Sequence, residues 1–124
     1  MPEDPEVIVD FEFEDGLLFV AVRNIGARPA YGISTRFDKT FRGLQGTREI
    51  PSLRLFRNIE FLAPGRAIRS LVDSSAAYFA RREPTRLTAT VTYRTADGQR
   101  HEHAIKHDLA VYRELAYLTP EVHG

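Results

Sequence analysis

The residues best suited to chemistry in this sequence are two histidines in the segment His101-Glu102-His103. In an extended strand, side chains two residues apart lie on one face about 7 Å apart, close enough for two imidazoles to share a zinc ion. His107 lies about 13 Å beyond His103 along such a strand, so further ligands must come from other strands. His101 and His103 are therefore candidate metal ligands. The alternative is that both are half-buried residues of a sheet margin.

Motifs for catalysis are the second class of chemistry to consider. No serine lies in a G-x-S-x-G motif or a comparable turn, and the glycines fit no phosphate-binding loop. Asp10, Glu12 and Glu14 share one face of a strand whose other face is apolar, which indicates a solvated edge rather than paired catalytic carboxylates. The absence of Cys excludes thiol nucleophiles, iron–sulfur clusters and disulfides. We expect a protein that is not an enzyme and holds no cofactor.

Arginine dominates the basic residues, because Lys39 and Lys106 are the only lysines among 17 basic side chains. The guanidinium group suits bidentate contacts with phosphate or carboxylate, so a polyanion-binding domain is one hypothesis. Its candidate residues are Arg36, Arg42, Arg48, Arg54 and Arg57. The formal net charge is zero and the longest basic run is Arg81-Arg82, so we do not expect a nucleic-acid partner.

Length and composition are those of one globular domain, which we expect to span residues 1–124. The chain has 124 residues, of which 43% are hydrophobic and 27% charged. No apolar run approaches the roughly 20 residues of a membrane helix. The first six residues include three acidic and no basic side chains, whereas a signal peptide begins with basic and then apolar residues. We expect a cytoplasmic protein if the chain is complete, whereas a fragment of a longer protein leaves its location open.

The first hairpin is visible in the alternation of apolar and polar residues over 7–14. Asp15-Gly16 then fits a two-residue type I′ turn. This turn predicts a register in which three apolar pairs face each other: Phe13 with Leu18, Phe11 with Val20, and Val9 with Val22.

The middle of the chain predicts shorter elements. Residues 24–29 form a loop, a third strand covers 33–37, and the polar stretch 39–58 is mostly loop. A strand over 59–62 ends at Pro64-Gly65, which fits a type II turn, and another strand follows over 68–72. Asp73 or Ser74 then caps a short helix that reaches Ala80.

The last hairpin joins an alternating strand over 87–93 to a second strand over 101–109. A three-residue loop at 96–98, with Gly98 in a left-handed conformation, pairs odd positions with odd positions. About seven short antiparallel strands with one short helix predict an all-β fold. We expect an immunoglobulin-like antiparallel β-sandwich.

The stretch VAVRNIGARPAYGISTRF resembles the opening motif of CARDB-type domains, which are cell-adhesion-related and immunoglobulin-like. In that motif an Asn-x-Gly-x-x-x-Ala loop follows a Val-rich strand. The turn at residues 62–65 and the hairpin over 93–109 resemble the middle turn and the closing hairpin of that family. The resemblance implies a non-catalytic binding or spacer module, of a family whose members usually lie outside the cell.

The sequence therefore predicts a non-enzymatic module that binds another protein through a sheet edge or through the loops at 24–29 and 39–58. The partner-binding candidates in these loops are Asn24, Arg28, Arg42, Arg48, Arg54 and Arg57. The alternatives are the polyanion-binding domain and a metal-binding protein that depends on His101 and His103.

Overall fold

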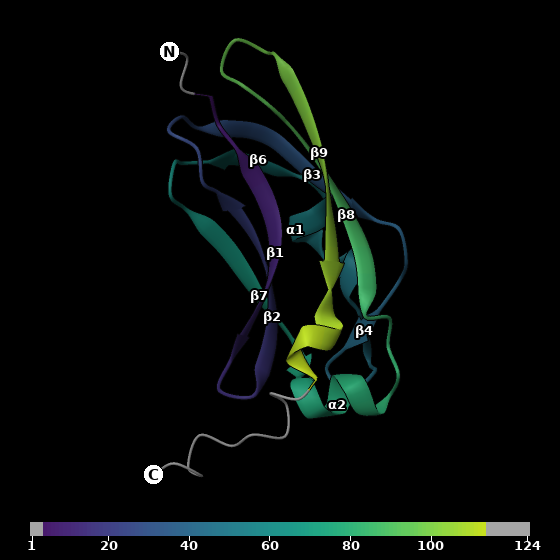
Figure 1. Cartoon of the computed structure of the whole chain (residues 1–124). Helices are drawn as coiled ribbons and strands as arrows, with labels where there is room; N and C mark the ends of the chain where they lie inside the picture. The colour runs from purple at the N-terminus through teal and green to yellow at the C-terminus, as the bar shows by residue number, and fades with distance from the viewer. Residues whose placement is uncertain (1–3, 114–124) are drawn as a thin grey trace.

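Antiparallel β-strands make up most of the computed structural model, which describes residues 4–113 (Figure 1). The strands are β1 (Val7–Glu14), β2 (Leu17–Asn24), β3 (Ala30–Phe37), β4 (Arg42–Gly43), β5 (Arg48–Glu49), β6 (Ile59–Leu62), β7 (Ala67–Ser74), β8 (Arg86–Arg94) and β9 (Arg100–Asp108). The helices are α1 (Arg54–Arg57) and α2 (Ser75–Ala80), with 3-10 segments η1 (Ile50–Ser52) and η2 (Leu109–Tyr112).

The strands form two main sheets and one small ribbon. One sheet has the order β1-β2-β7, the other has the order β6-β3-β8-β9, and β4 pairs only with β5. Buried apolar side chains from both main sheets form one core cluster. The prediction of a mainly antiparallel β fold is confirmed. The expected counts are corrected, because the described chain has nine strands and two short α-helices rather than about seven strands and one helix.

The β1–β2 hairpin has the register predicted from its turn. Phe13 pairs with Leu18, and the apolar pairs continue along the face that enters the core. Asp15 and Gly16 have φ values of 52° and 78°, as a type I′ turn requires at both central positions. The local turn thus fixes which face of β1 and β2 is buried.

The β8–β9 hairpin also follows the predicted register, with odd positions opposite odd positions. Tyr93 pairs with His101 and Val91 with His103. Gly98 has a φ of 91°, the left-handed conformation that the predicted loop needs. The histidines of β9 therefore lie on the same face as the apolar residues of β8.

The turn at Pro64-Gly65 carries the chain from one sheet to the other. Gly65 has a φ of 77°, and the backbone N–H of Arg66 donates to the Ala63 carbonyl at 3.1 Å. β6 before the turn pairs with β3, whereas β7 after it pairs with β2. A local turn signal predicted the bend correctly, although the change of sheet depends on pairing with distant strands.

The segment 39–58 is more ordered than the sequence predicts, so the expectation of a loop is wrong. It contains β4, β5, η1 and α1, and it supplies three buried residues to the core. The Phe56 ring lies edge-on to Phe37 at 5.0 Å between centroids, and Phe41 lies 5.9 Å from Phe11. These buried residues, Phe41, Ile50 and Phe56, are isolated in the sequence and follow no period of two or 3.6.

Side-chain contacts fix the positions of α2 and η2. Ser74 caps α2, because its hydroxyl accepts from the Ala77 N–H at 3.1 Å, as predicted. Tyr112 in η2 packs back on β1: its hydroxyl donates to the Phe11 carbonyl at 3.2 Å and its ring stacks on Phe13. The apolar residues Leu115, Tyr117 and Leu118, which follow η2 in the sequence, lie outside the described residues. Within residues 4–113, no helix has the length and apolar character to span a bilayer.

Candidate functional site

Asn24, a predicted partner-binding residue, is fully buried and has a structural role. Its Nδ2 donates to the carbonyl oxygens of Arg28 at 2.8 Å and Leu62 at 3.1 Å. Its Oδ1 accepts from the backbone N–H groups of Glu6 at 3.3 Å and Gly26 at 3.0 Å. The side chain thus joins the N-terminal segment, the 24–29 loop and the end of β6, and it is not available to a partner.

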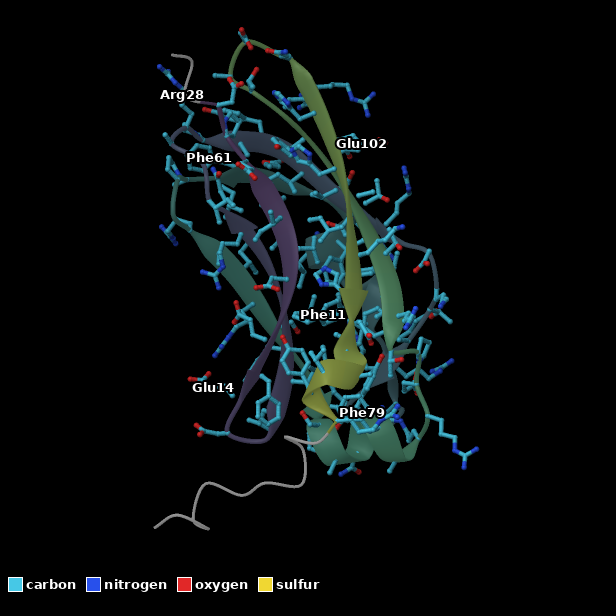
Figure 2. All side chains as sticks on the ribbon, in the orientation of Figure 1. Phe11, Glu14, Arg28, Phe61, Phe79 and Glu102 are labelled. Carbon is cyan, nitrogen blue, oxygen red and sulfur yellow. The ribbon has the colours of Figure 1, made fainter. Side chains whose placement is uncertain are left out.

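Arg28 lies at one end of the two sheets and lines a hollow of about 320 Å³ (Figure 2). The hollow lies where the N-terminal segment, the 24–29 loop and the β8–β9 turn meet. Its other lining residues are Asp4, Pro5, Thr95, Ala96, Asp97 and Gln99. Arg28 is thus exposed at this hollow, in contrast to the buried Asn24.

The other predicted arginines lie on separate elements. Arg54 and Arg57 of α1 line a hollow of about 430 Å³ together with Asn58 and Glu60. Arg42 and Arg48 lie on the β4–β5 ribbon, and Arg36 is exposed on β3. Of the five arginines proposed for a polyanion site, Arg54 and Arg57 are the two that line one hollow in the described chain.

The two candidate metal ligands both lie against the ring of Tyr93. His101 stacks on this ring at 5.3 Å between centroids, and His103 Nε2 lies 2.7 Å from the Tyr93 hydroxyl. Burial raises the pKa of Tyr93, and the charges of Glu6 and Asp4 add to the shift. Among residues 4–113, no group of three or more His, Cys, Asp or Glu side chains is close enough to hold a metal ion. The described geometry gives His103 a hydrogen-bond partner within the fold.

His107 provides a prediction about pH. Its ring lies edge-on to Phe11 at 5.0 Å between centroids, and burial lowers its pKa below the ordinary value of 6.5. The Val9 backbone and the charge of Asp10 raise the pKa, but burial has the larger effect. The unfolded chain therefore binds the proton more tightly than the folded chain. The stability contributed by neutral His107 is complete above pH 6.5 and is lost as the pH falls through the folded pKa.

An NMR titration of the His107 ring should give a midpoint below 6.5. His107→Gln should flatten the dependence of unfolding free energy on pH below this value. A ring that titrates at or above 6.5 would contradict the interpretation, because burial would then not disfavour the charged form.

The exposed aromatic residue Phe61 is a feature that sequence reasoning missed. Phe61 lies on the edge strand β6 with 53% of its surface exposed, and its ring meets Tyr31 of β3 edge-on at 5.5 Å between centroids. Figure 2 shows Phe61 toward the same end of the molecule as Arg28. We call Phe61 and Tyr31 the aromatic pair.

The alternation of buried positions is broken in both β3 and β6 at the aromatic pair. The buried positions Ala30 and Ile33 are three residues apart, and so are their buried partners Leu62 and Ile59. Regular alternation would separate buried positions by an even number of residues. Gly32, with a φ of 56°, lies where β3 has an extra residue relative to β8, because the pairing of these two strands shifts between Tyr31 and Ser34.

Charged residues lie next to the aromatic pair in the sequence and across the sheet. Glu60, which precedes Phe61, lines the hollow of Arg54 and Arg57. Tyr31 pairs with Arg94 on its other side. We call β6 and the adjoining aromatic pair the β6 margin: it combines the exposed Phe61 ring and the half-buried Tyr31 ring with the neighbouring Arg94.

Comparison with known proteins gives one match. The family model described as "Domain of unknown function (DUF8453)" matches residues 2–113. No curated protein and no solved structure matches the chain. The match therefore supports DUF8453 and gives no assignment to the CARDB-type domains that the sequence resembles.

Proposed function

The chain belongs to DUF8453, a family of unknown function, and we propose from its surface that it is a non-catalytic module that binds another protein through the aromatic pair on the β6 margin. The observation that carries the proposal is the exposure of Phe61 on an edge strand, in contact with Tyr31. The proposed partner covers these rings.

Single exposed apolar residues are common on protein surfaces and need no explanation. The β6 margin differs because a second aromatic ring lies against Phe61, and Arg94 pairs with Tyr31 on the neighbouring strand. Aromatic residues and arginine are the types that contribute most to protein–protein binding. Covering the exposed half of the Phe61 side chain would contribute about 1 kcal/mol from apolar burial alone.

The arrangement of the sheets also supports the finer proposal of an immunoglobulin-like β-sandwich. A three-stranded sheet and a four-stranded sheet share one core, and β6 is an edge strand of the larger sheet. In such a fold, a sheet edge and the adjoining loops are available for binding. The sequence predicts binding through a sheet edge or through loops without specifying which edge, and the proposal selects the edge at β6.

The test is a comparison of bait variants in a lysate of the organism that encodes the chain. We expect Phe61→Ala to reduce retention of the specific partner about tenfold, because removal of a central aromatic residue typically costs about 1–2 kcal/mol of binding. Quantitative mass spectrometry of the retained proteins measures this change.

Val111→Ala is the matched control. Val111 is 65% exposed, and it lies in η2, the yellow segment next to α2 in Figure 1, away from β6. It should retain the same proteins as the wild type. The proposal fails if no retained protein depends on Phe61, or if Val111→Ala has the same effect.

A further inference from the structure

The outward face of the four-stranded sheet carries a third hollow, of about 200 Å³. It is lined by Gly32, Ser34, Thr92, Tyr93, Arg94 and Arg100. The hollow adjoins the aromatic pair because Tyr31 pairs with Arg94. We call it the arginine hollow.

Two arginines face each other across this hollow. Arg94 and Arg100 form the last cross-strand pair of β8 and β9 before the turn, and both are exposed. Like charges directly opposite each other on antiparallel strands are destabilising. Among the described residues, neither arginine has a carboxylate within 4.0 Å, in contrast to Arg23, Arg69 and Arg81. An external anion would relieve the repulsion of this pair.

The Arg94 guanidinium lies against the backbone of β3 at Gly32. A Cβ atom at position 32 would be 2.8 Å from both terminal nitrogens of Arg94, so a side chain larger than that of glycine would displace the group. The left-handed φ of Gly32 and the shift in pairing belong to the same irregularity beside Tyr31. The guanidinium thus lies against the backbone of β3, in space that the missing side chain of Gly32 leaves open.

The remaining polar groups of the hollow suit an oxyanion. Ser34 Oγ and Thr92 Oγ1 lie 2.8 Å apart, so one hydroxyl donates to the other and the second hydroxyl hydrogen is available to a ligand. No acidic side chain lines the hollow. The acidic residue closest in register is Glu102, which pairs with Thr92 on the exposed side of β9 (Figure 2).

We propose that the arginine hollow binds an oxyanion, a carboxylate or a phosphate group, between Arg94 and Arg100. Both anions accept paired hydrogen bonds from guanidinium groups. Binding of the anion itself does not depend on the proposed function. The statement that a protein partner carries the anionic group next to its apolar contact does rest on the proposed function. The partner of matching chemistry has an acidic or phosphorylated residue beside an apolar one.

The test is an NMR titration of the protein with inorganic phosphate and, separately, with acetate, each at constant ionic strength maintained with chloride. We expect saturable shifts of the backbone amides of Ser34, Thr92 and Arg94 with at least one of the two anions. Saturation by acetate alone identifies a carboxylate site, and saturation by phosphate alone identifies a phosphate site. Absence of saturable shifts with both anions overturns the proposal.

Variants connect the binding to the geometry. Arg94→Ala and Arg100→Ala should each weaken anion binding at least fivefold. Arg36→Ala, which removes the same charge from an exposed position of β3 outside the hollow, should change it less than twofold. Equal weakening by Arg36→Ala would show general charge attraction and would overturn the site.

Two further variants test whether anion binding depends on the position of the Arg94 guanidinium and whether it depends on the aromatic pair. Gly32→Ala displaces the Arg94 guanidinium without changing the net charge, so it should weaken binding as Arg94→Ala does. Phe61→Ala should leave anion binding unchanged. If the protein binds the anion but no retained partner depends on Phe61, the anion site stands and only the proposed function is rejected.

Discussion

Replacement of Phe41 by alanine is expected to lower the free energy of unfolding by about 4 kcal/mol, the usual cost of removing a buried phenyl ring. Phe41 is 1% exposed, and its ring lies within 6.5 Å of three other aromatic rings, measured between centroids. These belong to Phe11, Phe37 and Tyr78, which come from both sheets and α2. The substitution leaves a cavity that rigid neighbours fill only in part.

Phe61→Ala is the matched control because it removes the same atoms from an exposed position. We expect it to cost less than about 1 kcal/mol, since its contact with Tyr31 is a surface contact. Urea denaturation followed by far-UV circular dichroism measures both values. A cost for Phe41→Ala as small as that for Phe61→Ala would contradict the placement of the 39–58 segment in the core.

Asn24→Ala is expected to destabilise the fold by about 3 kcal/mol, because it leaves buried hydrogen-bonding groups without a partner. The affected groups are the carbonyls of Arg28 and Leu62 and the N–H groups of Glu6 and Gly26. Hydrogen exchange should also show loss of protection at the end of β6, because Leu62 is joined to the loop through this side chain.

Asn58→Ala is the control for this change. Asn58 is exposed and follows α1, so its replacement should cost less than about 0.5 kcal/mol. Asn24→Asp retains the acceptor for Glu6 and Gly26 but loses the donor, so it should also destabilise the protein. Wild-type stability of Asn24→Ala would show that this network does not hold the loop.

The hairpins were predictable from the sequence because their signals are local. Asp15-Gly16 determines the turn type, and the turn type determines that Phe13 faces Leu18. Gly98 acts in the same way for the pairing of Tyr93 with His101. A strand register that depends on a short turn requires no knowledge of distant residues.

The contribution of the 39–58 segment was not predictable because its core residues are held by distant contacts. Gly43 illustrates this: a Cβ atom there would lie 2.0 Å from the Val72 carbonyl oxygen, and the Leu44 N–H donates to that oxygen at 2.7 Å. From its sequence neighbours alone, this glycine is typical of a loop. Its close approach to β7 is a property of the folded chain.

The candidate site shows the same division. Asn24, in an Asn-x-Gly loop, suggests an exposed turn, but its partner Leu62 lies 38 residues away. Phe61 alternates with Ile59 and so suggests a buried position, but β6 has two successive exposed residues beside the irregular part of β3. In both cases, the role of the residue depends on a strand far along the chain.

The most direct test of the proposed surface is photo-crosslinking in living cells, with p-benzoylphenylalanine placed at position 61 or at position 111. We expect position 61 to form one discrete crosslinked adduct with another protein, because the partner covers the β6 margin. Position 111 should form none. No adduct at position 61, or the same adduct at both positions, would contradict the conclusion that this margin is where the protein binds its partner.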